Sequence, residues 1–399
     1  MRCVITGAGQ IGTQLAHDLT AAGHDVTVIR RGGHAPEGTA LVRGDAGDRE
    51  VLQQAVRGAS AIFHCIHSSY SAAAWERDLP HREQAVMDVA ARADVPVVFP
   101  ESVYAFGLAA RDLREQDVRE RVPYEHGRHE SDPQAQEAAD SGLTAASAPS
   151  MASAKDSPIA SPVPASPLGH VRARLLAARA AHPARTLSVV AADLLGPTAA
   201  PGTSVFLSLV LEPAARGRRA WVMGDPDSPR SATYIPDLTR AMIVAAQNAQ
   251  ELAPYGDAVL LTPSLPPLSQ RRMAAEAVRA AQAVRAAQAA SAHEAAAHGE
   301  AAARGEAAVH EAASAAEAAN RNSISVGAAA GAPAVTGIPR WVFRAAGIAS
   351  PMARELGRQH YLWADRAVIH PGRLTAEYGL EPASWEHVLR EWACMRAAR

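Results

Sequence analysis

A glycine-rich turn near the amino terminus constrains the fold more than any other feature of this sequence. Residues 2–6 form a short apolar run rich in β-branched side chains, and the motif G-A-G-Q-I-G follows at once at residues 7–12. Apolar residues then recur at helical spacing up to Gly23, and a second apolar run begins at Val26. This order of strand, glycine turn, helix and strand is the context in which G-x-G-x-x-G predicts dinucleotide binding.

Each glycine of the turn has its own expected role. Gly7 permits the tight turn, Gly9 lets backbone amides approach a pyrophosphate, and Gly12 allows the helix to pack closely on the strand. The free N–H groups and the positive dipole at the helix start favour phosphate charge. We therefore predict a cofactor site formed by Gly7, Gly9, Gln10, Ile11 and Gly12.

Further strands and helices alternate along the chain. Repeated β-α units of this kind predict an α/β fold with a Rossmann-type, doubly wound parallel sheet. The predicted strands are 40–43, 61–66, 95–99, 187–192, 220–223 and 258–261, and the predicted helices are 48–57, 81–93, 169–181, 205–215 and 237–250. We expect Asp237 to cap the last of these helices.

Two segments interrupt the pattern and suggest a domain division. Residues 109–167, rich in Ser, Pro, Ala and charge, predict a long and partly disordered surface loop within a dinucleotide-binding domain 1–265. Residues 266–337 read as a low-complexity, alanine-rich insertion that has helix propensity but offers almost no large apolar side chain to bury. The segment 338–399 holds four of the six tryptophans and is expected to help form a smaller substrate lobe at the carboxyl edge of the sheet.

Bulk properties narrow the class of protein. The chain has 399 residues and a formal net charge of −2, which argues against a nucleic-acid partner. No apolar run is long enough to span a membrane, and the first strand leaves no room for a signal peptide. The three cysteines form no pattern, so a reducing, cytoplasmic location is expected. Only Lys155 among the 39 basic residues is lysine, which we interpret as composition bias.

Cofactor choice is predicted at the end of the second strand. There Arg30 and Arg31 stand where an acidic residue would bind the ribose of NAD, and arginine suits the 2′-phosphate of NADP. NADP is therefore the predicted cofactor, with NAD as the alternative if both arginines are merely solvated. Asp45 is placed to meet the adenine amino group or to cap the next helix. His67 is a candidate for lining the nicotinamide site. No metal site is expected at His64 and His67, because strand alternation places these two side chains on opposite faces of the sheet.

Four motifs together resemble the extended short-chain dehydrogenase/reductase superfamily, in its NAD-dependent epimerase/dehydratase group. They are T-G-A-G-Q-I-G at 6–12, E-S-V-Y-A-F-G at 101–107, D-L-L-G-P at 193–197 and A-T-Y-I-P-D at 232–237. The resemblance implies an enzyme that binds NADP(H) or NAD(H) and catalyses reduction or epimerisation of a small molecule.

The catalytic pair of that family is missing. The family uses Tyr-x-x-x-Lys on one helix, but the matching segment here has Leu168 and Arg172. By the resemblance, Arg172 could bind ribose and supply charge, and Ser102 could polarise a carbonyl or simply bond the backbone. Tyr104 and Tyr234 could replace the phenol, although core packing is the commoner role of such tyrosines. The alternative function is a non-catalytic NAD(P)-binding sensor or regulator; a structural protein organised by the alanine-rich segment has little support.

Overall fold

The molecule is built around a seven-stranded parallel sheet. The structure, a computed structural model, describes residues 1–119, 164–200, 202–304 and 333–398. The strands of the sheet are ordered β12-β7-β5-β4-β1-β2-β3. They are β1 (Arg2–Thr6), β2 (Asp25–Arg30), β3 (Ala40–Arg43), β4 (Ala61–His64), β5 (Val97–Ser102), β7 (Thr186–Ala191) and β12 (Asp257–Leu261). The strand order reverses between β1 and β4, which is where open α/β sheets bind ligands.

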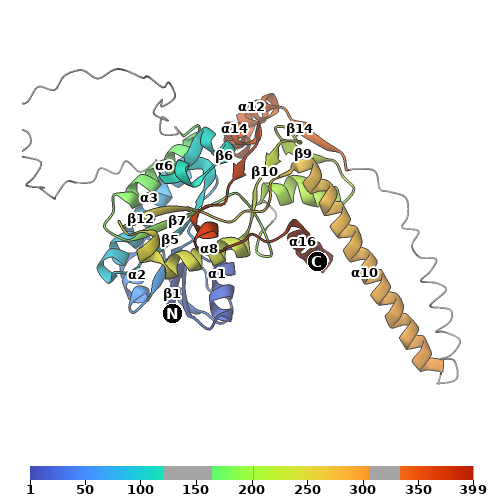
Figure 1. The fold of residues 1–399 in the computed structure, drawn as a ribbon, viewed down its shortest axis with the longest axis horizontal. Helices are drawn as coiled ribbons and strands as arrows, with labels where there is room; N and C mark the ends of the chain where they lie inside the picture. Colours follow the sequence, from blue (N-terminus) through green and yellow to red (C-terminus); the bar gives the residue numbers. More distant parts are fainter. Residues whose placement is uncertain (120–163, 201, 305–332, 399) are drawn as a thin grey trace, which may run out of the picture.

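Helices cover both faces of the sheet (Figure 1). Successive side chains of β1 show why: Cys3 and Ile5 join the core beneath one set of helices, whereas Val4 joins the core on the opposite face. The helices packed on the sheet are α1 (Gln10–Ala21) and α8 (Ile235–Gln247) on one face, and α2 (Arg49–Val56), α3 (Ala72–Ala93) and α6 (Pro167–Ala180) on the other. The predicted doubly wound α/β fold is confirmed.

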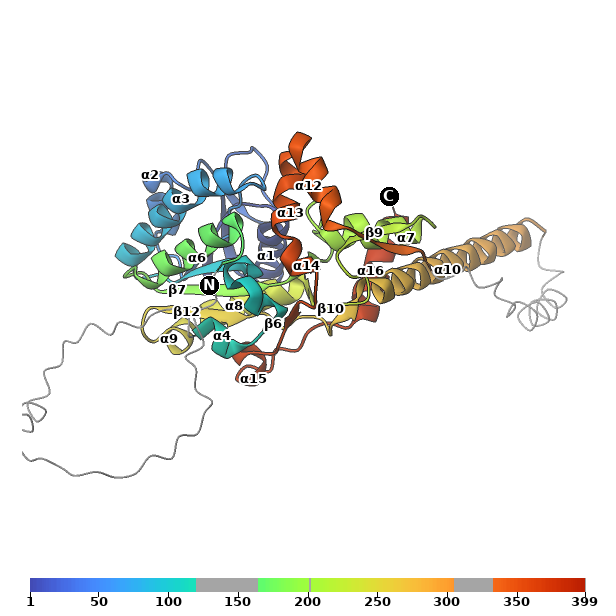
Figure 2. The ribbon, with the colours of Figure 1, turned by 90° about the horizontal axis from the view of Figure 1, so that it is seen from above.

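A second group of elements packs beside the sheet (Figure 2). Its core joins side chains far apart in sequence, such as Phe206, Met273, Trp363 and Trp392. Its helical elements are η2 (Phe206–Leu211), α7 (Glu212–Ala215), α10 (Gln270–Arg304), α12 (Arg340–Ala349), α13 (Pro351–Arg358), α14 (His360–Trp363) and α16 (Trp385–Ala397). Two strands of this group, β9 (Ala220–Met223) and β14 (Val335–Ile338), pair in parallel. The exact domain boundaries proposed from the sequence stay a prediction.

Short elements complete the described chain. The paired strands are β6 (Asp112–Leu113) with β15 (Val368–Ile369), β8 (Asp193–Leu195) with β11 (Ala232–Tyr234), and β10 (Pro229–Arg230) with β13 (Leu268–Ser269). The remaining helices are η1 (Val103–Arg111), α4 (Glu115–Arg119), α9 (Ala249–Leu252) and α15 (Arg373–Ala376). No helix in the described residues combines the length and the apolar character that crossing a membrane requires.

The alanine-rich segment differs from its predicted surface placement. Met273, Ala274 and Ala277 are fully buried in the first turns of α10, where the helix contacts α16, α7 and η2. Residues 285–295 are exposed, and the helix extends away from the body there (Figure 1). The prediction failed for the first turns because alanine buries well where neighbouring helices approach closely, even without large side chains.

Three other boundaries also differ from expectation. Helix α3 begins at Ala72, capped by Ser71, and continues through Pro80, where the sequence suggested a start. Helix α8 begins at Ile235, so Asp237 is not its cap; it lies in the first turn and accepts a 2.7 Å hydrogen bond from the Ala383 amide. The predicted loop 109–167 begins with ordered structure up to residue 119, and its residues 120–163 lie outside the described residues.

Candidate functional site

The glycine turn has the geometry of a ligand cradle. Gly7 has a φ of +87°, and a Cβ there would lie 3.1 Å from the Cys65 carbonyl oxygen. A Cβ on Gly12 would lie 1.9 Å from the Gly7 carbonyl oxygen. Around Gly9, by contrast, the described residues place no heavy atom within 4 Å of the Cβ position, apart from Gly9 itself and its chain neighbours. The chain itself therefore requires glycine at 7 and 12, whereas the bare backbone of Gly9 borders open space.

The start of α1 leaves hydrogen-bond donors for a ligand. Gly9 is the N-cap residue and offers no side-chain cap, and the first intrahelical bond runs from the Thr13 amide to the Gly9 carbonyl. The amides of Gln10 and Ile11 precede that bond. Open space, uncapped N–H groups and a helix dipole together fit the pyrophosphate of a dinucleotide.

Arg30 and Arg31 follow this cradle at the end of β2. Arg30 folds back over Gly32, whose Cβ position lies 3.2 Å from the Arg30 Nε atom. Arg31 is 79% exposed, with its Nε 4.0 Å from Asp45. Neither arginine forms a tight carboxylate pair among the described residues, so both side chains are available to an anion.

Asp45 is held by its own neighbours. It accepts hydrogen bonds from the Gly47 amide at 2.8 Å and from Arg82 Nε at 3.2 Å. Burial opposes ionisation, but these partners lower the pKa of Asp45 below its ordinary value. It does not cap α2, because Asp48 fills that position and accepts from the Glu50 amide. Its expected contact with adenine stays a prediction.

Ser102 lies at the carboxyl end of β5, next to a buried network of hydrogen bonds and ion pairs. Its amide donates to Glu101 Oε1 at 2.7 Å, and its hydroxyl lies 3.4 Å from the same oxygen. Glu101 Oε2 accepts from Arg179 at 2.9 Å, and Arg179 also donates to both oxygens of Glu83 and to Ser188. This network is almost fully buried and joins β5 to α3, α6 and β7.

Arg172 lies in a different setting from that of a ribose-binding lysine. Its Nε is 3.5 Å from Glu101 Oε1, and its guanidinium carbon lies 4.7 Å from the centroid of the Trp75 ring. The side chain is only 7% exposed, and Leu168 on the same helix is fully buried. The positive charge of Arg172 is thus shared with Glu101 and a tryptophan face.

Tyr104 packs within an aromatic group. Its hydroxyl is 3.1 Å from that of Tyr70, and its ring stacks on Trp75 at 6.0 Å. Burial, with the neighbouring Tyr70 and Asp193, raises the pKa of Tyr104 well above its usual 10. These surroundings favour the protonated form of the Tyr104 phenol, and the role of Arg172 beside it stays a prediction.

Asp193 and Tyr70 are site residues that the sequence analysis did not single out. Burial, partly offset by the charge of Arg230, raises the pKa of Asp193 to about 6. Burial also raises the pKa of Tyr70 to about 12, with Asp193 and Glu355 adding to the effect. The quoted motif D-L-L-G-P contains Asp193, but only the fold brings its charge close enough to raise the pKa of Tyr70 and of Tyr104.

Helix α13 and its end bring further polar groups to this cluster. Gln359 donates from Nε2 to Ser166 Oγ at 2.8 Å, and Ser166 caps α6. Gln359 Oε1 and Glu355 Oε2 are buried without a hydrogen-bond partner among the described residues. Buried acceptors of this kind favour a ligand that carries hydroxyl or amide donors.

Of the two other candidate residues, His67 borders the same aromatic group through Trp75, whereas Tyr234 has separate partners. His67 bonds the Ser68 carbonyl at 2.6 Å and meets Trp75 edge-on; burial, together with Arg172, lowers its pKa to about 4. The hydroxyl of Tyr234 donates to Glu391 at 2.9 Å, so it is not joined to the Tyr104 cluster by any hydrogen bond in the described residues. No cluster of His, Cys, Asp and Glu suited to a metal occurs in the part of the chain that is described.

Comparisons with known proteins agree with this architecture. Residues 3–149 match the model of the NAD dependent epimerase/dehydratase family. The UDP-glucose 4-epimerase of Thermotoga maritima aligns at a TM-score of 0.57 and 13% identity, covering 100% of this chain and 99% of that one. The corresponding enzyme of Thermus thermophilus aligns at 0.56 and 17%, covering 100% of both chains.

A third solved structure, the Bordetella bronchiseptica enzyme WbmH in complex with NAD+, aligns at 0.54 and 13% identity, covering 98% of this chain and 96% of that one. A search of curated proteins gave no match. At these identities the solved structures establish the fold alone. The family match is thus confined to residues 3–149, and the solved structures add only that the chain as a whole has the fold of these epimerases.

Proposed function

We propose that the chain is an NAD(P)-dependent oxidoreductase of the epimerase/dehydratase type that acts on a polar, hydroxyl-bearing small molecule. One observation carries this proposal: the open Gly9 cradle and the Ser102–Tyr104 segment lie on neighbouring parts of the same carboxyl edge of the sheet. The orphaned acceptors on Glu355 and Gln359 support a substrate with several hydroxyl groups. The Thermotoga maritima epimerase was solved with UDP-glucose, which is a compound of this class.

The preferred cofactor in this proposal is NADP(H). At the end of β2, Arg30 and Arg31 stand where a carboxylate would accept a hydrogen bond from a 2′-hydroxyl. Their two guanidiniums suit a 2′-phosphate instead. NAD(H) is the alternative, since the Thermus thermophilus and Bordetella bronchiseptica proteins were solved with NAD. When bound, the nicotinamide ring would donate or accept a hydride.

Tyr104 is the proposed proton donor. In the reducing direction, Tyr104 would donate its phenolic proton to the carbonyl oxygen of the substrate, which becomes the hydroxyl of the alcohol. Ser102 donates a hydrogen bond to the same oxygen and polarises the carbonyl. The hydroxyl of Tyr70, 3.1 Å from that of Tyr104, can donate to the resulting phenolate and stabilise it. In the oxidising direction the same proton returns to Tyr104 from the alcohol.

In this proposal the raised pKa of Tyr104 keeps the phenol protonated near neutral pH. A protonated phenol is ready to act as an acid at neutral pH, whereas alcohol oxidation needs the phenolate. We therefore expect carbonyl reduction to exceed alcohol oxidation near pH 7, and oxidation to accelerate as the pH rises. Arg172 acts in this scheme as a positioning residue for Glu101 and Trp75.

A non-catalytic NAD(P) sensor is the second candidate. The buried Leu168 and the stacked Arg172 favour it, because both occupy places that the resemblance assigns to catalysis. The two functions separate in one experiment, which combines calorimetry with NADPH and NADH and a screen of carbonyl compounds and nucleotide sugars by nicotinamide absorbance. Turnover of any screened compound supports the enzyme. Tight cofactor binding with no turnover across the screen supports the sensor, and absence of cofactor binding overturns both.

A further inference from the structure

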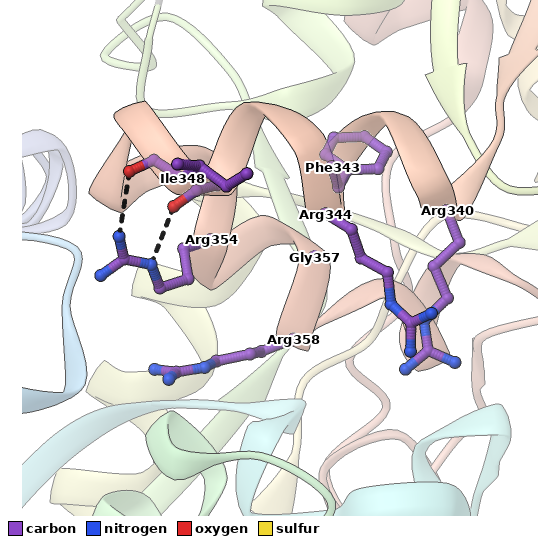
Figure 3. A pocket seen from close by; sticks show the side chains of 8 residues that line it. Arg340, Phe343, Arg344, Ile348, Arg354, Gly357 and Arg358 are labelled. Carbon is purple, nitrogen blue, oxygen red and sulfur yellow. Dashed lines mark hydrogen bonds between the residues drawn. The ribbon is translucent and has the colours of Figure 1, made fainter.

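A groove between α12 and α13 concentrates arginines away from the dinucleotide site. Its volume is about 510 Å³. The four arginines that line it, Arg340, Arg344, Arg354 and Arg358, come from both helices (Figure 3). Phe343 and Ile348 add an apolar wall, and Gly347 allows the helices to approach, since its Cβ position lies 3.1 Å from the Cα of Arg354.

Two of these arginines are already engaged and two are not. Arg354 donates to the Gly347 carbonyl at 2.9 Å, and Arg358 pairs with Glu355 at 2.9 Å. Arg340 and Arg344 are exposed and have no salt bridge among the described residues, and both point toward the same end of the groove. The Oε1 atom of Glu355 is thus already paired with Arg358, and the charge of Arg340 and Arg344 is left for a ligand.

The placement of Arg340 and Arg344 is electrostatically unfavourable for the isolated protein. Like charges four residues apart on a helix repel each other. Arg340 is also the first residue of α12, where the positive end of the helix dipole disfavours a cation. Burial lowers the pKa of the neighbouring His360, and the charge of Arg340 adds to that effect. A bound anion would offset the positive charge that all three interactions share.

We propose that this groove binds a phosphate ester whose organic part is apolar or aromatic. Two guanidiniums can each grip phosphate oxygens in a bidentate manner, and Phe343 and Ile348 would contact the organic part. The source of the ester is either a free metabolite or a phospholipid headgroup, and the two share this chemistry. The proposal does not depend on the activity proposed above.

The test uses the full chain and phenyl phosphate as the probe, with binding measured by calorimetry. The variant is Arg340→Gln with Arg344→Gln, which should fold at least as well as the parent because it removes repulsion. The matched control is Arg57→Gln with Arg285→Gln, which removes the same charge at two exposed sites elsewhere. We expect the groove variant to lose at least about tenfold in affinity and the control to match the parent.

Other arms separate the alternatives. Phenyl phosphate binding that disappears in Gly9→Asp but survives in the groove variant belongs to the dinucleotide cradle and overturns the proposal. Benzoate binding more tightly than phenyl phosphate also overturns it. Co-sedimentation with phosphatidylglycerol vesicles that is lost in the groove variant assigns the ester to a lipid headgroup, whereas binding of the soluble probe alone assigns it to a metabolite. Equal binding by parent and groove variant in every arm refutes the site.

Discussion

The two ends of the predicted cofactor groove differ sharply in how closely they follow the family pattern. At the pyrophosphate end, Gly7, Gly9 and Gly12 keep both the motif and the geometry that the motif requires. At the nicotinamide end, the expected Tyr-x-x-x-Lys helix carries Leu168 and Arg172, both buried. The difference teaches that the features predicted for cofactor binding and those predicted for catalysis lie on separate parts of the chain. The sequence can therefore keep one set while it departs from the other.

The largest expected effect lies at the pyrophosphate end. Gly9→Asp should abolish measurable binding of NADPH and NADH, because it fills the open side of the cradle and places a negative charge at the helix start. The variant should still fold, since no protein atom lies within 4 Å of the new Cβ. Calorimetry gives the affinity, and circular dichroism checks the fold. Gly9→Ala should show an intermediate loss; unchanged affinity in Gly9→Asp would remove this end from the cofactor site.

At the nicotinamide end, Tyr104→Phe should reduce turnover by about a hundredfold or more while leaving cofactor affinity intact. The change removes the proposed proton donor but preserves the ring that packs on Trp75. Tyr255→Phe is the matched control, because that tyrosine is 77% exposed. Steady-state rates on a substrate found in the screen give the answer. Full activity in Tyr104→Phe would falsify its assignment as the proton donor.

His64 lies in β4, between the strands β1 and β5 that carry the two ends of the predicted cofactor site. Its titration tests how far this central strand stabilises the fold on which both ends depend. Burial, with Arg179 adding to it, lowers the pKa of His64 from 6.5 to about 3. Below pH 6.5 the unfolded chain therefore takes up a proton that the folded chain refuses, so stability falls as the pH drops. This loss amounts to about 3 kcal/mol between pH 7 and pH 4. His64→Gln keeps a partner for Thr6 and should flatten the acid limb of a urea-denaturation pH series. An unchanged acid limb would show that the ring accepts a proton in the folded protein.

The smallest expected effect concerns cofactor preference. If Arg30 and Arg31 bind a 2′-phosphate, NADPH should bind more tightly than NADH, and the double change to alanine should narrow the gap by about tenfold. Competition calorimetry measures both affinities in both proteins. Arg57→Ala with Arg285→Ala serves as the charge-matched control. A preference for NADH in the parent protein would contradict the predicted 2′-phosphate site. The adenosine end would then depart from its expected pattern, as the nicotinamide end does.

Much of the fold could be predicted because its signals are local. Strands buried on both faces leave continuous apolar runs, and the glycine turn requires only six neighbouring residues. The failures have physical reasons. Pro80 suggested a helix start but is tolerated inside α3, and the first turns of α10 are buried through alanines that carry no recognisable apolar pattern.

The cluster of Tyr70, Tyr104 and Asp193 could not be predicted from the sequence, because its members come from segments that are far apart in the chain. Tyr70 follows β4, Tyr104 follows β5, and Asp193 lies in β8. The hydrogen bond from Gln359 to Ser166 joins residues 193 positions apart. No spacing in the sequence indicates such an encounter, which depends on how the carboxyl-terminal helices pack. The resemblance pointed to Leu168 and Arg172 as the place of the missing pair, which stays a prediction, and it did not indicate the groups that surround them.

The aromatic surroundings of Trp75 also have an optical consequence. This indole is 1% exposed and lies against Tyr104, His67 and Arg172. Its fluorescence should be blue-shifted relative to that of Trp341, which is 68% exposed. Reduced nicotinamide absorbs in the range where tryptophan emits, so energy transfer from Trp75 would report on occupancy of the nicotinamide end. The protein thus contains its own spectroscopic probe at the place where its chemistry departs most from the family.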